Sequence, residues 1–484
     1  MEDRKYVIMA LLYALLLFPA YYAYKSFELP ENSVLAVDND ATYLGTVKSA
    51  LWAFATPWPS PDVSIFTDVT LGSAIAFLPV TAIWLVSGID PWPIIIFLNT
   101  LFTFGYLIVI LKIMQRLLPG GEWKYAFPIM LFANGIGGLL YFPLGEFGGF
   151  TEAGLGNLFW GWMTNSAFYQ IFTLFTGFAS LFAFIEGNNR AATILLFLTF
   201  LVYPIAGVLF SCLVIAYSLF NNRLPLSLKT VLPPLLALVP WAYFILLNPA
   251  PYEKLSAFYS TPILFPTNFI LTVLINSGIA VLLAGYAVSQ KGFFADKNRK
   301  FLCAWAAALL IAILLQTAIK KIDVSKLLVM YWPPISMLAG IGLAGVASKL
   351  KVKAEIIFIA IMILSLPSFI LFYANNGVVV ASAMDTDVYD SLIFLRSQPQ
   401  GTVLADPRIA RYVPYLAEKR SLTGAPLPDK DAETAYENFL SGDSGILQTR
   451  NISYVITDSM LRDDSSEKIY SSGNLSVYAV KKFV

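Results

Sequence analysis

The sequence predicts a mainly α-helical protein, with a polytopic transmembrane bundle of about eleven spans followed by a C-terminal extracytoplasmic α/β domain. Of its 484 residues, 57% are hydrophobic and only 13% are charged, whereas about a quarter of the residues in soluble domains are charged. Apolar runs near the roughly 20 residues that cross a bilayer recur along the chain. Charged residues become much more frequent from about Asn375 onward, which predicts that a soluble domain ends the chain.

The composition also limits the chemistry. The chain has no histidine, so acid–base work must use carboxylates, tyrosine or lysine. Its two cysteines, Cys212 and Cys303, both lie in apolar runs, which disfavours a disulfide framework or a thiolate metal site. A net charge of +1 implies no nucleic-acid partner.

The first apolar run, residues 6–24, follows a charged N-terminus. It is too long for a cleaved signal peptide, so we expect a retained span whose N-terminus is cytoplasmic. Later spans are expected at about 125–142, 167–186, 230–247, 268–289, 300–319, 328–346 and 355–374.

Basic loops orient these spans. The connectors 290–300 and 348–353 are the most basic short loops, so the positive-inside rule places both in the cytoplasm and the C-terminal domain outside. Two apolar runs, 69–89 and 191–220, leave the number of crossings in the N-terminal half open.

If run 69–89 crosses the membrane and run 191–220 crosses it once, the basic loop around Arg116 falls outside and the acidic loop 143–165 falls inside. Both placements break the charge rule. We therefore favour a version in which 69–89 lies along the outer surface or re-enters. Residues 191–220 then form a hairpin that turns near Pro204.

The C-terminal segment alternates helix-like and strand-like patterns. Helices are expected at 387–396, 408–417 and 431–440, and strands at 402–406, 454–457 and 475–480. Alternation of this length predicts a small α/β layer. We therefore expect a transmembrane domain at 1–375, with a long first outer loop at 25–93, and a soluble domain at 376–484.

An acidic pair lies in this first outer loop. Asp38 and Asp40 are two residues apart, so on an extended segment they face the same way. They could share a cation, or one could act as a base that the other orients. Alternatively, Asp40 caps a helix that starts at Ala41. The stretch 43–54 reads as an amphipathic helix at the membrane interface.

A single N-terminal span, an acidic pair in a long first outer loop and an interfacial helix together resemble the GT-C superfamily of membrane glycosyltransferases. This superfamily includes the protein O-mannosyltransferases and the aminoarabinose transferases. The stretch from Trp160 to Gln170 leads into a span and resembles the polar segment that these families have before the corresponding span. Tyr203-Pro204 stands where many relatives have His-Pro. The chain has no Trp-Trp-Asp sequence, which disfavours the oligosaccharyltransferase branch.

The resemblance implies that a hexosyl or pentosyl group moves from a polyprenyl-phosphate donor to an extracytoplasmic acceptor, which is a lipid, glycan or protein. It assigns Asp38 as the base or the ligand of Mn²⁺ or Mg²⁺, with Asp40 as second choice. The leaving phosphate needs cations. For these we expect Lys326 first, then Lys320 and Lys321, although such lysines also anchor lipid headgroups.

A second acidic loop and two tryptophans complete the candidates. Relatives often use an acid from the next outer loop, and Glu152 and Glu146 are the acids there. The alternative is a flexible glycine-rich loop with incidental charges. Trp160 and Trp162 could stack on a sugar or prenyl chain, or simply anchor the protein at the interface.

Two other functions fit an integral, multi-pass membrane protein of this kind. A transporter or flippase needs ionisable residues buried within its spans, and these are scarce in the sequence. A non-catalytic scaffold would bind a partner through the exterior domain, with the acidic pair capping a helix.

Overall fold

The computed structural model describes residues 3–20, 33–36, 70–89, 91–133, 168–247, 269–319, 325–375, 382–410, 412–422, 430–441, 445–458 and 466–481. The chain divides into two compact units. We call Met1–Tyr21, Ile95–Phe244 and Ser256–Gly377 the bundle unit, and Tyr22–Ile94, Ile245–Leu255 and Val378–Val484 the sheet unit. Each is described by itself.

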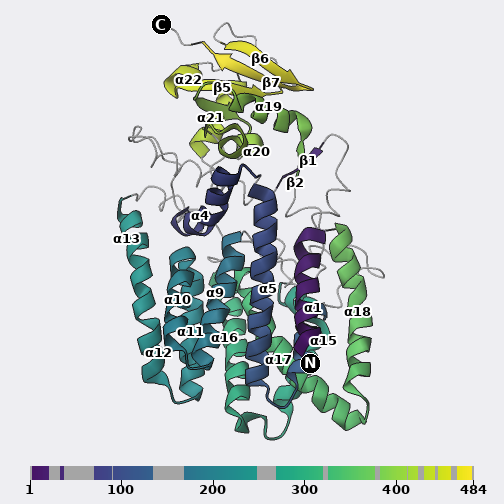
Figure 1. Ribbon diagram of the computed structural model, residues 1–484. Helices are drawn as coiled ribbons and strands as arrows, with labels where there is room; N and C mark the ends of the chain where they lie inside the picture. Colours follow the sequence, from purple (N-terminus) through teal and green to yellow (C-terminus); the bar gives the residue numbers. More distant parts are fainter. Residues whose placement is uncertain are drawn as a thin grey trace. The chain divides into compact units, whose positions relative to one another are not determined.

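The bundle unit consists of helices that run alongside one another (Figure 1). They are α1 (Asp3–Leu15) with the π-helical turn η1 (Leu16–Ala20), α5 (Pro91–Leu117), α6 (Trp123–Phe132), α9 (Phe168–Ile185), α10 (Asn189–Val202), α11 (Pro204–Phe220), α12 (Leu224–Val231), η3 (Pro233–Ala237), α13 (Leu238–Leu247), α15 (Phe269–Ser289), η4 (Phe293–Ala295), α16 (Lys297–Ile319), α17 (Ser325–Leu350) and α18 (Ala354–Asn375). The first residues of α5 and the last of α13 belong to the sheet unit.

Four stretches among the described residues are long and apolar enough to cross a membrane. They are Pro91–Leu117, Phe168–Ile185, Leu224–Ala242 and Met330–Leu350. The expected number of about eleven spans stays a prediction. The expected continuous span 230–247 is wrong in one respect, because η3 separates α12 from α13. Pro233 and Pro234 lack the N–H groups that would continue α12.

Residues 189–220 form two helices rather than one. Tyr203 has an extended backbone (φ −146°, ψ 92°) between α10 and α11, and Pro204 begins α11. The helical region is sterically disfavoured for a residue that precedes proline, which favours a turn there. The turn lies at the predicted position.

Contacts with α9 show how this pair of helices runs. The Oγ1 atoms of Thr176 and Thr199 are 2.9 Å apart, and the Ser180 hydroxyl donates to the Ala192 carbonyl at 3.1 Å. Residue numbers therefore rise along α9 as they fall along α10, so these helices are antiparallel.

The next helix, α11, runs parallel to α9. Phe178 of α9 meets Phe210 of α11 with ring centres 4.8 Å apart, and Phe184 meets Tyr217 at 6.2 Å. Since α10 is antiparallel to α9, α10 and α11 are antiparallel to each other. The predicted hairpin is confirmed.

The sheet unit contains a five-stranded sheet in the order β4-β3-β5-β7-β6. Strands β3 (Thr402–Ala405), β4 (Arg420–Ser421) and β5 (Ile452–Thr457) are parallel. Strand β7 (Leu475–Val480) runs antiparallel to both β5 and β6 (Ser466–Ser472). The predicted α/β character of the C-terminal segment is confirmed.

Helices α19 (Thr386–Arg396), α21 (Lys430–Leu440) and α22 (Gly445–Thr449) accompany this sheet. Its core includes Leu404, Tyr436, Phe439, Leu447, Ile452, Val455 and Tyr478. The expected helix at 408–417 is found as two short helical elements, α20 (Pro407–Ala410) and the π-helical turn η6 (Val413–Ala417). Pro414, early in η6, cannot donate the hydrogen bond that a continuous helix requires.

Two further elements of the sheet unit come from the expected first outer loop. Run 69–89 forms the helix α4 (Thr70–Ser87), and β1 (Ser33–Ala36) pairs with β2 (Ser382–Asp385) in a separate two-stranded sheet. The expected interfacial helix at 43–54 lies outside the described residues.

Candidate functional site

Ion pairs connect several chain segments at one end of the bundle. Lys112 Nζ near the end of α5 lies 3.6 Å from Asp3 Oδ2 at the start of α1. Arg116 Nε lies 3.1 Å from Oε1 of Glu186, directly after α9. The N-terminus, the end of α5 and the end of α9 therefore share this end.

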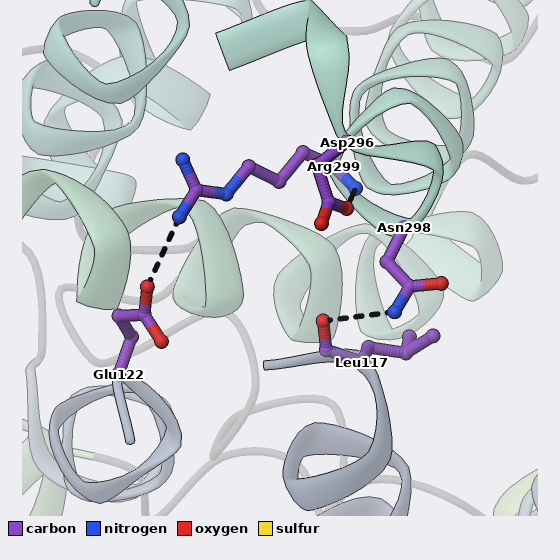
Figure 2. Close-up of polar contacts among 5 residues, drawn as sticks. All are labelled: Leu117, Glu122, Asp296, Asn298 and Arg299. Carbon is purple, nitrogen blue, oxygen red and sulfur yellow. Dashed lines mark hydrogen bonds and ion pairs between the residues drawn. The ribbon is translucent and has the colours of Figure 1, made fainter. Parts of the chain in front are cut away.

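Figure 2 shows two more segments joined there. Arg299 Nη2 lies 3.1 Å from Glu122 Oε1, and Asn298 Nδ2 donates to the Leu117 carbonyl at 3.3 Å. Asp296 Oδ1 accepts from the Arg299 N–H at 2.9 Å, which caps the start of α16. We call this end, marked by Asp3, Lys112, Arg116, Glu122, Glu186 and Arg299, the charged end.

The Asp3–Lys112 pair bears on the two predicted crossing patterns, which stay predictions. If α4 crossed the bundle as well as α5, Lys112 would lie at the end opposite to Asp3. Instead the two side chains meet, which agrees with the version in which run 69–89 does not cross.

The start of α17 lies at the other end of the bundle. Trp332 Nε1 in α17 donates to the Met130 carbonyl in α6 at 2.8 Å, and Gly340 packs against Ala126. The two helices are therefore antiparallel. Because α6 begins next to Glu122 at the charged end, the backbone of Lys326, the second residue of α17, lies at the opposite end.

The last helix of the bundle, α18, leads to the same opposite end. Its second residue, Glu355, interacts with Tyr125 at the start of α6, so α18 begins at the charged end. It ends at Asn375, and β2 follows from Ser382. The chain thus leaves α18 at the end where it also leaves α1.

The strands that follow these two helices pair with each other. The register of β1 with β2 is antiparallel, from Ser33 opposite Asp385 to Ala36 opposite Ser382. Asp38 is the second residue after Ala36. The first-loop strand that precedes the acidic pair is therefore fixed to the segment that enters the C-terminal domain.

The predicted site residues themselves lie almost wholly outside the described residues. This holds for Asp38, Asp40, Glu146, Glu152, Trp160, Trp162, Lys320 and Lys321. Lys326 is described by its backbone alone. Their assigned roles therefore stay predictions.

No metal centre is found within the described part of the chain. There, no group of three or more Asp, Glu, Cys or His side chains could hold a metal ion. The expected ligands of Mn²⁺ or Mg²⁺, Asp38 and Asp40, are not among these residues, so the metal also stays a prediction.

Comparison with known proteins gives a likeness in structure but not in sequence. No protein-family model and no curated protein matches the sequence. The Archaeoglobus fulgidus oligosaccharyltransferase in its apo form matches with a TM-score of 0.55 and 12% identity, covering 94% of this chain and 69% of that one. The same enzyme tethered to an acceptor peptide containing the NVT sequon matches with a TM-score of 0.51, the same identity and the same coverage.

Arabinofuranosyltransferase AftD from Mycobacteria matches with a TM-score of 0.60 and 11% identity, over 100% of this chain and 42% of that one. This chain therefore spans less than half the length of AftD. At such identities the likeness concerns the fold alone, so it does not separate the branches of the superfamily. The predicted resemblance is confirmed at that level: this chain shares its fold with the oligosaccharyltransferase and with AftD.

Proposed function

We propose that this protein is a membrane glycosyltransferase that moves one sugar from a polyprenyl-phosphate donor to an extracytoplasmic acceptor. Its fold is shared with two glycosyltransferases. In this proposal the charged end faces the cytoplasm, because it carries Lys112 and Arg116 near the end of α5 and Arg299 in the first turn of α16. The opposite end, where α1 leads to β1 and α18 leads to β2, then faces outward.

The pairing of β1 with β2 is the observation that carries the proposal. It holds Ala36 opposite Ser382 and so fixes the backbone two residues before Asp38. A catalytic carboxylate must be held in place to act, and sites supported by paired strands are more precise than sites on free loops.

Asp38 is the proposed base. Displacement at the anomeric carbon has oxocarbenium character, and a carboxylate can both accept the proton of the acceptor and stabilise the developing positive charge. Attack from the face opposite to the leaving phosphate inverts the anomeric centre. Asp40 would orient Asp38 or share Mn²⁺ or Mg²⁺ with it.

Lys326 is the proposed partner of the leaving phosphate. Its backbone position at the start of α17, at the end opposite to the charged end, supports this role if that end faces the outer leaflet. Lys320 and Lys321 precede it on the connecting loop. Glu152 or Glu146 would serve as a second acid, with Trp160 and Trp162 stacking on the sugar.

A panel of donors tests the class of reaction. The full chain in lipid nanodiscs would be incubated with radiolabelled polyprenyl-phosphate sugars, with and without Mn²⁺ or Mg²⁺. We expect one donor to bind and to be hydrolysed slowly, with weaker binding in Lys326→Ala. Failure to bind any donor would contradict the proposal and favour a scaffold that acts through its C-terminal domain. Flux of the lipid across the bilayer without sugar transfer would favour a flippase.

A further inference from the structure

The helix α5 carries two polar side chains in the interior of the bundle. Asn99 is 2% exposed and Thr103 is fully buried, although α5 is one of the stretches apolar enough to cross a membrane. Phe97 and Leu101 on the opposite face are exposed. The helix therefore turns its polar pair inward and its apolar side chains outward, the arrangement typical of functional groups within a membrane bundle.

One atom of each side chain has no hydrogen-bond partner among the described residues. These atoms are Asn99 Oδ1 and Thr103 Oγ1. A buried hydroxyl or amide without a hydrogen bond costs free energy. Threonine in a helix normally avoids this cost by donating to the carbonyl four residues earlier. On the same helix Thr100 does so, donating to the Ile96 carbonyl at 2.7 Å.

The two unpaired groups are close to each other. Residues four apart on a helix lie on one face, with Cβ atoms about 6 Å apart. Asn99 is eight residues from Pro91 at the start of α5, which is about 12 Å along the helix. Since Lys112 and Arg116 mark the charged end, Asn99 and Thr103 lie toward the opposite end, where the proposed reaction takes place.

Resting on the proposed function, we propose that Asn99 and Thr103 bind hydroxyl groups of the sugar carried by the donor lipid. The carboxamide oxygen of Asn99 accepts a hydrogen bond from one sugar hydroxyl, and the Thr103 hydroxyl donates to or accepts from another. A phosphate is a poor match for Asn99 Oδ1, because ionised phosphate oxygens carry no hydrogen to donate. A pair built for hydroxyl groups would also discriminate among sugars, since a donor lacking a hydroxyl leaves the protein group unpaired.

Other buried groups are also unpaired among the described residues, including Ser277 Oγ and Trp305 Nε1. Ser277 lies on α15 and Trp305 on α16, so these two atoms do not form a pair on one helix. Asn99 and Thr103 differ because they present two hydrogen-bonding atoms to one ligand from adjacent turns.

Equilibrium binding to the full chain in nanodiscs tests the assignment. The probes are polyprenyl phosphate itself and polyprenyl-phosphate-linked mannose, glucose and arabinose. We expect Thr103→Val and Asn99→Leu each to weaken binding of the preferred sugar lipid at least about tenfold, the effect of losing one hydrogen bond of ~1.4 kcal/mol. Binding of polyprenyl phosphate should not change. Thr103→Ser, which keeps the hydroxyl, should bind as the wild type does.

Thr100→Val is the matched control, because Thr100 lies on the same helix with its hydroxyl already paired; it should bind both kinds of lipid normally. Wild-type binding of a sugar lipid with no loss in Thr103→Val or Asn99→Leu would overturn this inference and leave the proposed function standing. Equal loss of sugar lipid and polyprenyl phosphate would overturn it too, since it indicates general damage. A wild type that binds no sugar lipid would overturn both.

Discussion

Ala36 lies opposite Ser382 in the antiparallel pair of β1 and β2, although 346 positions separate them in the sequence, the difference between 382 and 36. One follows the first helix of the bundle and the other follows the last. Their pairing links the first loop, which carries Asp38, to the start of the C-terminal domain. The C-terminal domain thereby becomes part of the framework of the proposed site.

Disulfide trapping tests this register. In a chain whose Cys212 and Cys303 are replaced by serine, Val34→Cys with Met384→Cys should cross-link on mild oxidation, because the two positions are directly opposite and face the same side. Mobility on a non-reducing gel reports the bond. Val34→Cys with Ala383→Cys is the control, since adjacent residues of a strand face opposite sides. Equal cross-linking of the two pairs would contradict the register.

Labelling from one side of sealed vesicles tests the path of the chain. Cysteines at Arg116 and Asp296 should react with an impermeant maleimide from one side, because both positions lie at the charged end. A cysteine at Asn474, in the turn between β6 and β7, should react only from the other side. Reaction of the Arg116 position together with Asn474 would mean that α4 crosses the membrane.

The packing of α9 on α11 predicts a pair of contrasting glycine substitutions. A Cβ atom at Gly177 would overlap the ring of Phe210, which is fully buried, so Gly177→Ala should lower the free energy of unfolding by about 1–3 kcal/mol. At Gly285 a Cβ would meet nothing within 4 Å, so Gly285→Ala should stabilise the helix by up to about 1 kcal/mol. Thermal unfolding in detergent compares them, and the same sign for both would argue against this packing.

The C-terminal domain contains a buried lysine. Lys419 is 3% exposed, and its ammonium group donates to the Gln398 carbonyl at 2.8 Å. Burial lowers the pKa of Lys419 below 10.5, although the neighbouring Glu418 carboxylate raises it. Between the folded pKa and 10.5 the unfolded chain holds a proton that the folded chain has released, so stability should rise with pH in this window.

Lys419→Met should flatten that rise when unfolding is followed from pH 7 to about 10. Burial raises the pKa values of Tyr436 and Tyr454 above 10.0. These tyrosines therefore reduce stability above about pH 10 in both proteins, and the difference between wild type and variant isolates the lysine. Parallel curves over the whole range would show that Lys419 titrates as an exposed lysine does.

Local patterns in the sequence predicted much of the C-terminal domain. The expected strand at 475–480 coincides with β7, and the expected helices at 387–396 and 431–440 coincide within a residue with α19 and α21. Strand β6 was not foreseen, because Ser466–Ser472 is mostly polar and an edge strand with two solvated faces shows no apolar alternation.

Local patterns could not predict which distant strands pair. Ser33–Ala36 is only four residues long, and its composition does not indicate that it pairs with β2. Asn99 and Thr103 are recognisable in the sequence as two polar residues in an apolar run. Only the packing of α5 shows that both are buried and that Asn99 Oδ1 and Thr103 Oγ1 have no hydrogen-bond partner among the described residues. The acidic pair was found because carboxylates two apart are a local signal, and its chemistry stays a prediction.

The most direct measurement is the rate of sugar transfer by Asp38→Asn, with donor binding measured on the same sample. The variant keeps the size of the side chain and removes its charge, so we expect normal donor binding with transfer reduced at least about 10²-fold, as on loss of a catalytic base. Asp296→Asn, the same change at the charged end with its helix cap retained, should transfer at the wild-type rate. Undiminished transfer by Asp38→Asn would contradict the central claim that this carboxylate carries the reaction.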